Sequence, residues 1–308
     1  QLSYLKKIMQ IVENILASGV LLTTPILLAA MGGLFNRLGG IVNIGLEGKM
    51  LLGAIVALLV SANTNSWLLG ILAAAFASSL AGFLFSILIT RLNANMIIVG
   101  FGLNIFIAGL VGFYLKWFHG SSGTLKLENT VLLPKISIPF INDLPLLGTL
   151  FSNKDPLTWI SWLIALSMPW IIFKTRLGIR VRCAGSDEHV ARAIGLNVKT
   201  LMDFSSSVAG FFAGLAGAHL SIGMLGLFSM GLISGRGFIA LAAFYFGRNM
   251  PIRTSLVCLV FGILDSMQIR LQGLGLPSEP VQAIPWITVI GILSFMGWRE
   301  HRNSQELG

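Results

Sequence analysis

Residues 39–49 read Gly-Gly-Ile-Val-Asn-Ile-Gly-Leu-Glu-Gly-Lys and interrupt an apolar stretch of the chain. Glycine adopts backbone conformations that other residues cannot, and a bilayer tolerates non-helical backbone only where protein or a water-filled cavity covers it. The four glycines therefore predict a broken helix or a tight turn beside a polar path, with Asn43 and Glu47 as its polar groups. Taken alone, the stretch also fits a loop at the membrane surface, from which Lys49 would reach the lipid headgroups.

The composition of the whole chain indicates that its surroundings are mostly lipid. Of its 308 residues, 55% are hydrophobic and only 11% are charged, and a soluble protein with so little charge would not stay in solution. Apolar runs recur at lengths near the roughly 20 residues that a helix needs to cross a bilayer. We therefore expect an all-α protein, a polytopic transmembrane helical bundle with broken helices and about eight or nine membrane segments. Residues 1–308 form a single transmembrane domain in this interpretation.

The hydropathy pattern places these segments along the chain. Tyr4–Ser18 has one apolar and one charged face, which predicts an amphipathic helix in the membrane interface before the first span. The spans expected after it are Gly19–Phe35, Met50–Val60, Trp67–Thr90, Met96–Trp117, Trp159–Phe173, Phe204–Ile222, Phe238–Phe246, Ser255–Ile269 and Val281–Trp298. Gly210 and Gly214 form a GxxxG pattern, which predicts close helix packing either within the bundle or against a second subunit.

The basic residues indicate the orientation of the loops rather than binding to nucleic acid, although the net charge is +9. Six of the 21 lysines and arginines lie in residues 174–200, so this loop is expected on the cytoplasmic side. The loop 118–157 is rich in Ser, Gly, Asn and Pro and nearly balanced in charge, which suits the outer side. The N-terminal residues lack the cleavage site of a signal peptide, so no cleavable leader is expected.

The basic loop 174–200 also contains a predicted short helix. Ser186 has the side chain of an N-cap, and the carboxylates of Asp187 and Glu188 would lie at the positive end of the helix dipole. Gly195 is expected to end the helix. Such a helix suits a cleft in a separate cytoplasmic subunit, whose push would move the attached spans as rigid bodies. The alternative is a solvated amphipathic turn without a partner.

A second glycine-rich break is predicted at Gly223–Gly237, in the other half of the chain. Paired breaks of this kind point to a central substrate path. Polar side chains within membrane segments are costly in hydrocarbon and usually face the interior of a bundle. The candidates for the substrate path are Asn43, Glu47, Asn104, Arg236, Asp265 and Gln268. Glu47 and Arg236 could instead form a buried pair that pins the two breaks together.

Neither catalysis nor metal binding is predicted. The histidines are scattered without the spacing of metal ligands, and we interpret each as an ordinary loop or packing residue: His119, His189, His219 and His301. Cys183 and Cys258 are far apart, so neither a disulfide framework nor a metal site is expected. The chain also lacks the G-x-x-x-x-G-K-[ST] sequence that binds nucleotide phosphates.

Four strings resemble the permease subunits of bacterial ABC importers, in the branch that holds the ribose, branched-chain amino acid and nucleoside systems. They are residues 40–48 followed by Leu-Leu-Gly-Ala at 51–54, residues 92–104 beginning Leu-Asn-Ala-Asn-Met, residues 235–248 beginning Gly-Arg-Gly-Phe-Ile-Ala-Leu-Ala-Ala, and residues 182–198 beginning Arg-Cys-Ala-Gly-Ser-Asp-Glu-His. The second and third are similar to the nucleoside and simple-sugar permeases, and the fourth is similar to the family's loop that docks on the ATPase.

The resemblance implies the ABC importer permease fold, in a chain that binds no cofactor of its own. ATP would be hydrolysed by a separate ABC ATPase subunit, docked on Gly185, Ser186, Asp187, Glu188, Ala191, Arg192 and Gly195. The other partners implied are a second permease subunit that is a non-identical paralogue, an extracytoplasmic substrate-binding lipoprotein and membrane lipid. The cargo implied is a nucleoside or a related simple sugar, carried by alternating access across the inner or plasma membrane of a bacterial cell.

Two other classes of protein are the alternatives. A channel or an ion-coupled secondary transporter would account equally well for the broken helices, and its uptake would survive ATP depletion but collapse with the ion gradient. An intramembrane enzyme would need a cluster of His, Asp and Glu, or one centred on Ser, within the spans, and the sequence offers none.

Overall fold

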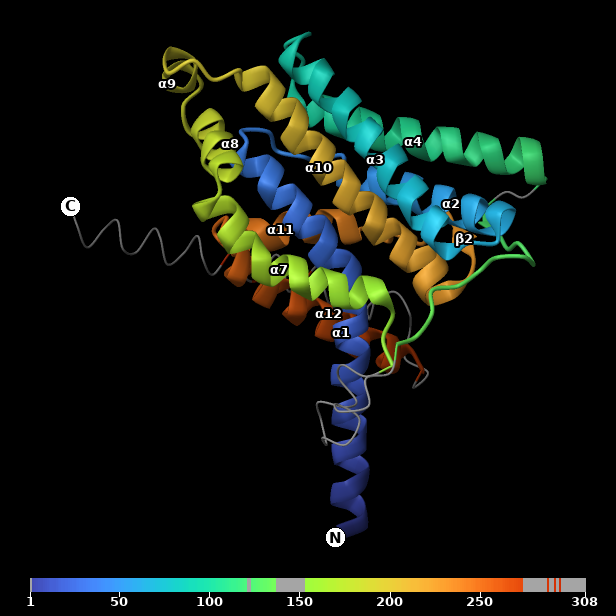
Figure 1. Ribbon diagram of the computed structural model, residues 1–308. Coiled ribbons are helices and arrows are strands. Elements are labelled where there is room, and N and C mark those ends of the chain that lie inside the picture. Colours follow the sequence, from blue (N-terminus) through green and yellow to red (C-terminus); the bar gives the residue numbers. More distant parts are fainter. Residues whose placement is uncertain are drawn as a thin grey trace.

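Figure 1 shows the bundle of helices in the computed structural model, which describes residues 2–120, 123–136 and 153–273 and, beyond them, only the isolated helical positions 287, 291 and 294. Within the described residues, seven helices are long and apolar enough to cross a membrane, and a shorter apolar helix accompanies them. This confirms the polytopic helical bundle. The last expected span, Val281–Trp298, falls outside the described residues except at those three positions.

The elements follow one another in a simple order. They are α1 (Leu2–Leu38), α2 (Leu46–Thr64), α3 (Trp67–Thr90), α4 (Met96–His119), β1 (Thr124–Leu125), α7 (Pro156–Lys174), α8 (Arg176–Ser186), α9 (Glu188–Ala193), α10 (Val198–Ala218), the π-helix η1 (His219–Leu225), β2 (Phe228–Ser229), α11 (Arg236–Phe246) and α12 (Pro251–Gly273). The two short strands pair antiparallel, so the outer loop contacts the segment that follows η1.

The expectation of a separate interfacial helix over Tyr4–Ser18 is wrong, because α1 runs without interruption through this segment. Its packing against α12 explains the continuity. The Ser266 hydroxyl donates to the carbonyl oxygen of Ile15 at 2.9 Å, and a Cβ on Gly19 would lie 3.0–3.1 Å from Ile263. Contacts with α12 therefore begin within this segment, at Ile15, and continue into the span that follows it.

The expected start of the second span at Met50 is also wrong, because α2 already begins at Leu46. The first amides of a helix lack partners within the helix and need acceptors from elsewhere. Asn104 on α4 supplies one of them, since its Oδ1 accepts from the Gly48 amide at 2.8 Å. The first break therefore covers only residues 39–45, and Glu47 and Lys49 lie in the first turns of a helix.

The two ends of the bundle are distinct. In Figure 1, α8 and α9 lie at one end, and α1 projects from the other. We name the end with α8 and α9 the inner end, following the positive charge of this loop. On this orientation α1 runs from the outer side inward, and α7 does the same before it reaches α8.

Helix α10 lies at the centre of the bundle and packs closely on α2 and α3. A methyl group on Gly210 would overlap the carbonyl oxygen of Ser78, and one on Gly214 would overlap that of Ala74. A methyl group on Gly53 of α2 would likewise overlap the backbone of Gly214. The GxxxG pattern therefore serves packing within the bundle, where small residues let helices approach.

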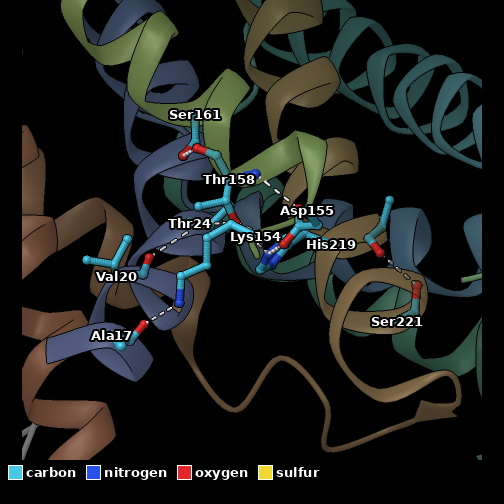
Figure 2. A network of polar contacts seen from close by, with 10 residues as sticks. Ala17, Val20, Thr24, Lys154, Asp155, Thr158, Ser161, His219 and Ser221 are labelled. Carbon is cyan, nitrogen blue, oxygen red and sulfur yellow. Dashed lines mark hydrogen bonds and ion pairs between the residues drawn. The ribbon is translucent and has the colours of Figure 1, made fainter. Parts of the chain in front are cut away.

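A buried polar network joins four segments near the outer end of the bundle (Figure 2). His219 lies 3.1 Å from the Asp155 carboxylate, which also accepts from the amide and hydroxyl of Thr158 at 3.0 and 2.9 Å. Thr24 on α1 donates to the Thr158 hydroxyl at 3.1 Å, and Lys154 donates to a carbonyl of α1 at 2.8 Å. His219 is fully buried, as expected for a packing residue, and its polar contact holds the head of η1 to the start of α7.

The pKa of Asp155 lies below its usual range. Burial alone would raise this pKa, but the hydrogen bond and the charge of His219, together with the hydroxyl and amide of Thr158, outweigh it. A carboxylate whose folded-state pKa is depressed stabilises the folded protein above its unfolded-state pKa. That stability is lost as the pH falls through the folded-state value.

We predict that Asp155→Asn lowers the free energy of unfolding by about 3 kcal/mol at neutral pH, because it breaks a buried pair. The variant should also lose part of the acid sensitivity of the native protein below about pH 4, since the titrating group is gone. Thermal unfolding in detergent across this pH range measures both effects. The exposed residue His189 provides the control His189→Gln, and equal stability of Asp155→Asn and native protein at neutral pH would contradict the prediction.

Candidate functional site

The first break, residues 39–45, begins where α1 ends. Gly40 has φ +98°, which favours glycine, and the chain then continues in a non-helical conformation to Gly45. Asn36, in the last turns of α1, is fully buried and accepts hydrogen bonds from the Ser205 and Ser206 hydroxyls of α10 at 2.9 Å each. The start of the break is thus fixed to the central helix of the bundle.

Lys49 is fully buried within the bundle, so the alternative of a lysine that reaches the lipid headgroups is wrong. Its Nζ donates to the Oδ1 of Asn43 at 2.6 Å and lies 4.1 Å from the centre of the Phe85 ring on α3. Both contacts suit an amine donor, one through a hydrogen bond and one through the face of an aromatic ring. Lys49 therefore holds the first break against α2 and α3.

Asn104 closes the first break from the side of α4. Besides accepting from the Gly48 amide, its Nδ2 donates to the Ile44 carbonyl oxygen at 3.1 Å. One side-chain amide thus satisfies a backbone donor and a backbone acceptor that the break leaves without helix partners. This contact explains why a polar residue lies within the apolar helix α4.

The second break runs from η1 to the start of α11. Ser234 and Gly235 both have positive φ, at 49° and 80°, and Gly235 supplies no side chain to cap α11. Glu47 fills that role from α2, since its two carboxylate oxygens accept from the amides of Gly235 and Gly237 at 2.8 Å each. Carboxylates are favourable at a helix N-terminus, where free amides and the positive end of the dipole lie. One side chain thus joins the two breaks.

The proposed pair of Glu47 with Arg236 is therefore wrong in its details, because Glu47 binds backbone amides. Arg236 instead forms an ion pair with Asp265 of α12 at 3.1 Å, and its guanidinium also donates to the Leu232 carbonyl at 3.2 Å. This pair fixes the second break to α12. Gln268 lies one turn farther along α12 and is partly buried.

Five of the six expected path residues lie in the breaks or make polar contacts at their edges: Asn43, Glu47, Asn104, Arg236 and Asp265. The buried Asp203 of α10 was not singled out by the sequence. It accepts from Ser86 at 2.7 Å and pairs with Arg91 at 3.3 Å, which joins α10 to α3 at the inner end. In the described residues, no group of His, Cys, Asp and Glu is arranged to hold a metal ion.

The inner loop forms two helices, α8 and α9, where the sequence predicted one. Ser186 is the last residue of α8, so its expected role as N-cap is wrong, and Asp187 caps α9 by accepting from the amides of His189 and Val190. Glu188 pairs with Arg192 on the surface of α9, and Gly195 follows α9 with φ +82°, as expected for a helix end.

Gly185 and Ala191 face the interior of this chain. Ala191 is fully buried against Ala184 and Val198. A methyl group on Gly185 would overlap the carbonyl oxygen of Leu38 and approach Gly39 and Gly40, so α8 lies directly on the first break. The exposed large apolar residues of α9 and the turn after it are Val190 and Ile194, 53% and 64% exposed.

We predict that Asn43→Leu destabilises the protein more than Lys49→Met. The first leaves a buried Nζ without its hydrogen-bond acceptor, at a cost of about 3 kcal/mol, whereas the second leaves only an amide oxygen unpaired, at about 1–2 kcal/mol. The double variant should be more stable than Asn43→Leu alone, because replacing both partners removes the unpaired nitrogen. Thermal unfolding in detergent measures all three, and a less stable double variant would refute the pairing.

A family model described as the permease component of the branched-chain amino acid transport system matches residues 15–293. The chain is 30% identical to the nucleoside ABC transporter permease protein NupC of Lactococcus lactis, over 92% of this chain and 93% of the relative. It is 31% identical to the guanosine ABC transporter permease protein NupQ of Bacillus subtilis, over 94% of each chain. It is 28% identical to a putative glucose ABC transporter permease of Haloferax volcanii, over 93% of this chain and 92% of the relative.

No solved structure matches the chain. The family works in ABC systems, in which a permease component acts with an ATPase and partner subunits, and its role is transport rather than catalysis. The seven apolar helices agree with this role and with a multi-pass position in the plasma membrane. The chain therefore belongs to the family of permease components of the branched-chain amino acid transport system type.

Proposed function

We propose that this permease imports nucleosides, with simple sugars as the second candidate class of cargo, and that ATP bound and hydrolysed on a separate ATPase subunit drives its alternating access. The names of the Lactococcus lactis and Bacillus subtilis relatives support the nucleoside, and that of the Haloferax volcanii relative supports the sugar. The further partners are a second, non-identical permease and an extracytoplasmic lipoprotein that delivers the substrate.

The observation that carries the proposal is a continuous series of contacts from the inner loop to both breaks. Gly185 of α8 lies on the residues that open the first break, and the same segment continues into α2, whose Glu47 holds the N-terminus of α11. A movement of α8 would therefore reach the first break directly and the second break through one carboxylate. Packed elements of this kind move as rigid bodies.

The ATPase is expected to bind the tip of the inner loop. Val190 and Ile194 offer an apolar contact, and Arg192 with Glu188 forms a charged edge beside it. A small apolar centre with a polar rim is the usual composition of a protein interface. Ser186, Asp187 and Gly195 shape this surface by ending α8, capping α9 and ending α9, respectively.

The substrate path is expected between this chain and the second permease, on the face formed by α4 and the second break. Only 17% of the α4 span is buried, against 72% of the α1 span. Phe101 of α4 is 49% exposed and stacks on Phe238 of α11, with ring centres 6.2 Å apart. Ser234 of the second break is exposed as well. In this proposal the polar residues Asn43, Glu47, Asn104, Arg236, Asp265 and Gln268 set the shape of the path rather than form a deep pocket in one chain.

We predict that Glu47→Gln reduces ATP-dependent uptake of labelled guanosine by about tenfold or more. The glutamine side chain is neutral and has one acceptor oxygen where the carboxylate has two, so one of the two amides loses its acceptor and the other keeps only an uncharged one. The exposed Glu128 provides the control Glu128→Gln. Unchanged uptake by Glu47→Gln at equal expression would contradict the role of the carboxylate. Uptake that persists without ATP and follows an ion gradient would overturn the ATP-driven mechanism.

A second prediction separates docking from coupling. Val190→Asp with Ile194→Asp should abolish co-purification of the ATPase, because charges replace the apolar contact. Gly185→Leu should instead leave the ATPase bound but reduce uptake strongly, because the added side chain forces α8 away from the first break. Co-purification and uptake are measured on the same cells, with Lys199→Gln as the control on the exposed loop surface. Retention of the ATPase by the double aspartate variant would disprove this docking surface.

A further inference from the structure

A basic hollow of about 490 Å³ opens at the inner end of the bundle, beside the joint between α8 and the first break. Its lining residues come from the end of α1, from α8 and from the turn before α12: Arg37, Leu38, Ile179, Arg182, Cys183, Gly185, Ser186 and Asn249. Two arginines and no acidic residue line it. The hollow therefore has an excess of positive charge that a ligand can neutralise.

Both arginines have their guanidinium groups on aromatic rings. The Arg37 guanidinium lies 5.9 Å from the ring centre of Tyr245, and that of Arg182 lies 4.7 Å from the ring centre of Phe173. Stacking positions a guanidinium while it leaves the N–H groups at its edge available as donors. The Arg37 Nε is buried and has no hydrogen-bond partner in the part of the chain that the structure describes.

The acidic residues that lie close in sequence to those lining the hollow already have polar partners. Asp187 caps α9, Glu188 pairs with Arg192, and Asp203 pairs with Arg91. Among the described residues, neither Arg37 nor Arg182 forms an ion pair with a carboxylate. The negative charge that balances the two arginines is therefore expected from a group outside the described residues.

The position of the hollow favours a phosphate group at the membrane surface. Arg37 lies in the last turn of one membrane span, and Asn249 lies two residues before the start of another. This is the depth at which lipid headgroups lie, and basic pockets between helices on the cytoplasmic side are known to bind anionic headgroups. Leu38 and Ile179 add apolar lining, and Ile179 is 52% exposed, which suits the first carbons of the acyl chains of a lipid.

We propose that this hollow is a phosphate-binding site, in which Arg37 and Arg182 hold the headgroup phosphate of an anionic phospholipid. Arginine matches phosphate because its planar fork donates two parallel hydrogen bonds. Ser186 supplies a further hydroxyl donor at the rim. A phosphate bound by both arginines links the end of α1 to α8. It would therefore stabilise the contact between Gly185 and the first break. The binding site itself does not depend on which substrate the permease carries.

The test uses the full chain purified in detergent, stripped of lipid, with thermal unfolding as the readout. Dioleoylphosphatidylglycerol should raise the unfolding temperature saturably, and dioleoylphosphatidylcholine should do so much less. Arg37→Gln and Arg182→Gln should each weaken the apparent affinity for phosphatidylglycerol about tenfold, because each removes charged hydrogen bonds. Arg180→Gln, on the same helix but outside the hollow, is the matched control and should bind as the native chain does.

Adding inorganic phosphate at constant ionic strength shows whether the phosphate group that binds in the hollow comes from a lipid or from solution. A stabilisation by phosphate alone that both glutamine variants lose supports the binding site and assigns it a soluble ligand. Equal lipid binding by the native chain and both variants overturns the proposal. The proposal is also overturned if neither phosphatidylglycerol nor inorganic phosphate stabilises the chain and the two glutamine variants no longer co-purify with the ATPase. The arginines would then contact a protein partner. If a glutamine variant does not fold, Arg37→Lys and Arg182→Lys are used in its place. They keep the positive charge but lack the two parallel donors of the guanidinium, so each should weaken lipid binding by the same order of magnitude.

Discussion

The carboxylate of Glu47 is the contact on which the arrangement of both breaks depends. A membrane interior offers no water to backbone groups, so a break in a helix persists only where other protein atoms satisfy the freed donors and acceptors. The α11 N-terminus has no side-chain cap of its own, and Glu47 accepts from two of its amides. Glu47 can do so only because α2 starts at Leu46, directly after the first break. The conformation of each break therefore depends on the conformation of the other.

The other buried polar groups around the breaks follow the same rule, each joining a break to a different helix. Asn36 connects the end of α1 to α10, Asn104 connects the first break to α4, and Arg236 connects the second break to α12 through Asp265. Paired polar groups in an apolar interior add little net stability, but removing one partner is costly. Their value here is positional, because apolar packing alone would let the break segments adopt several conformations of similar energy.

The sequence predicted those features that depend on local pattern. Trp67–Thr90 was expected with the bounds that α3 has, because its apolar run ends at polar residues on both sides. The family followed from short contiguous strings, which need no knowledge of the fold. Contacts between distant residues could not be predicted in this way. The start of α2 depends on Asn104, 56 positions after Gly48, and the burial of Lys49 depends on Phe85 of another helix. The choice of Asp187 over Ser186 as a cap likewise follows from the packing of Gly185 on the first break, which prolongs α8.

The two ends of the bundle are held together by different kinds of contact. At the inner end, Gly185 meets backbone atoms at van der Waals distance, and such a contact resists a push whatever the charges around it. At the outer end, His219 and Asp155 hold η1 to α7 through buried polar contacts, whose strength depends on charge and on exclusion of water (Figure 2). In the proposed function, one side of the path stays closed while the other opens. Gly185 would then pass a movement of α8 to the first break by direct contact, and the polar contacts between η1 and α7 would hold the outer end until it opens.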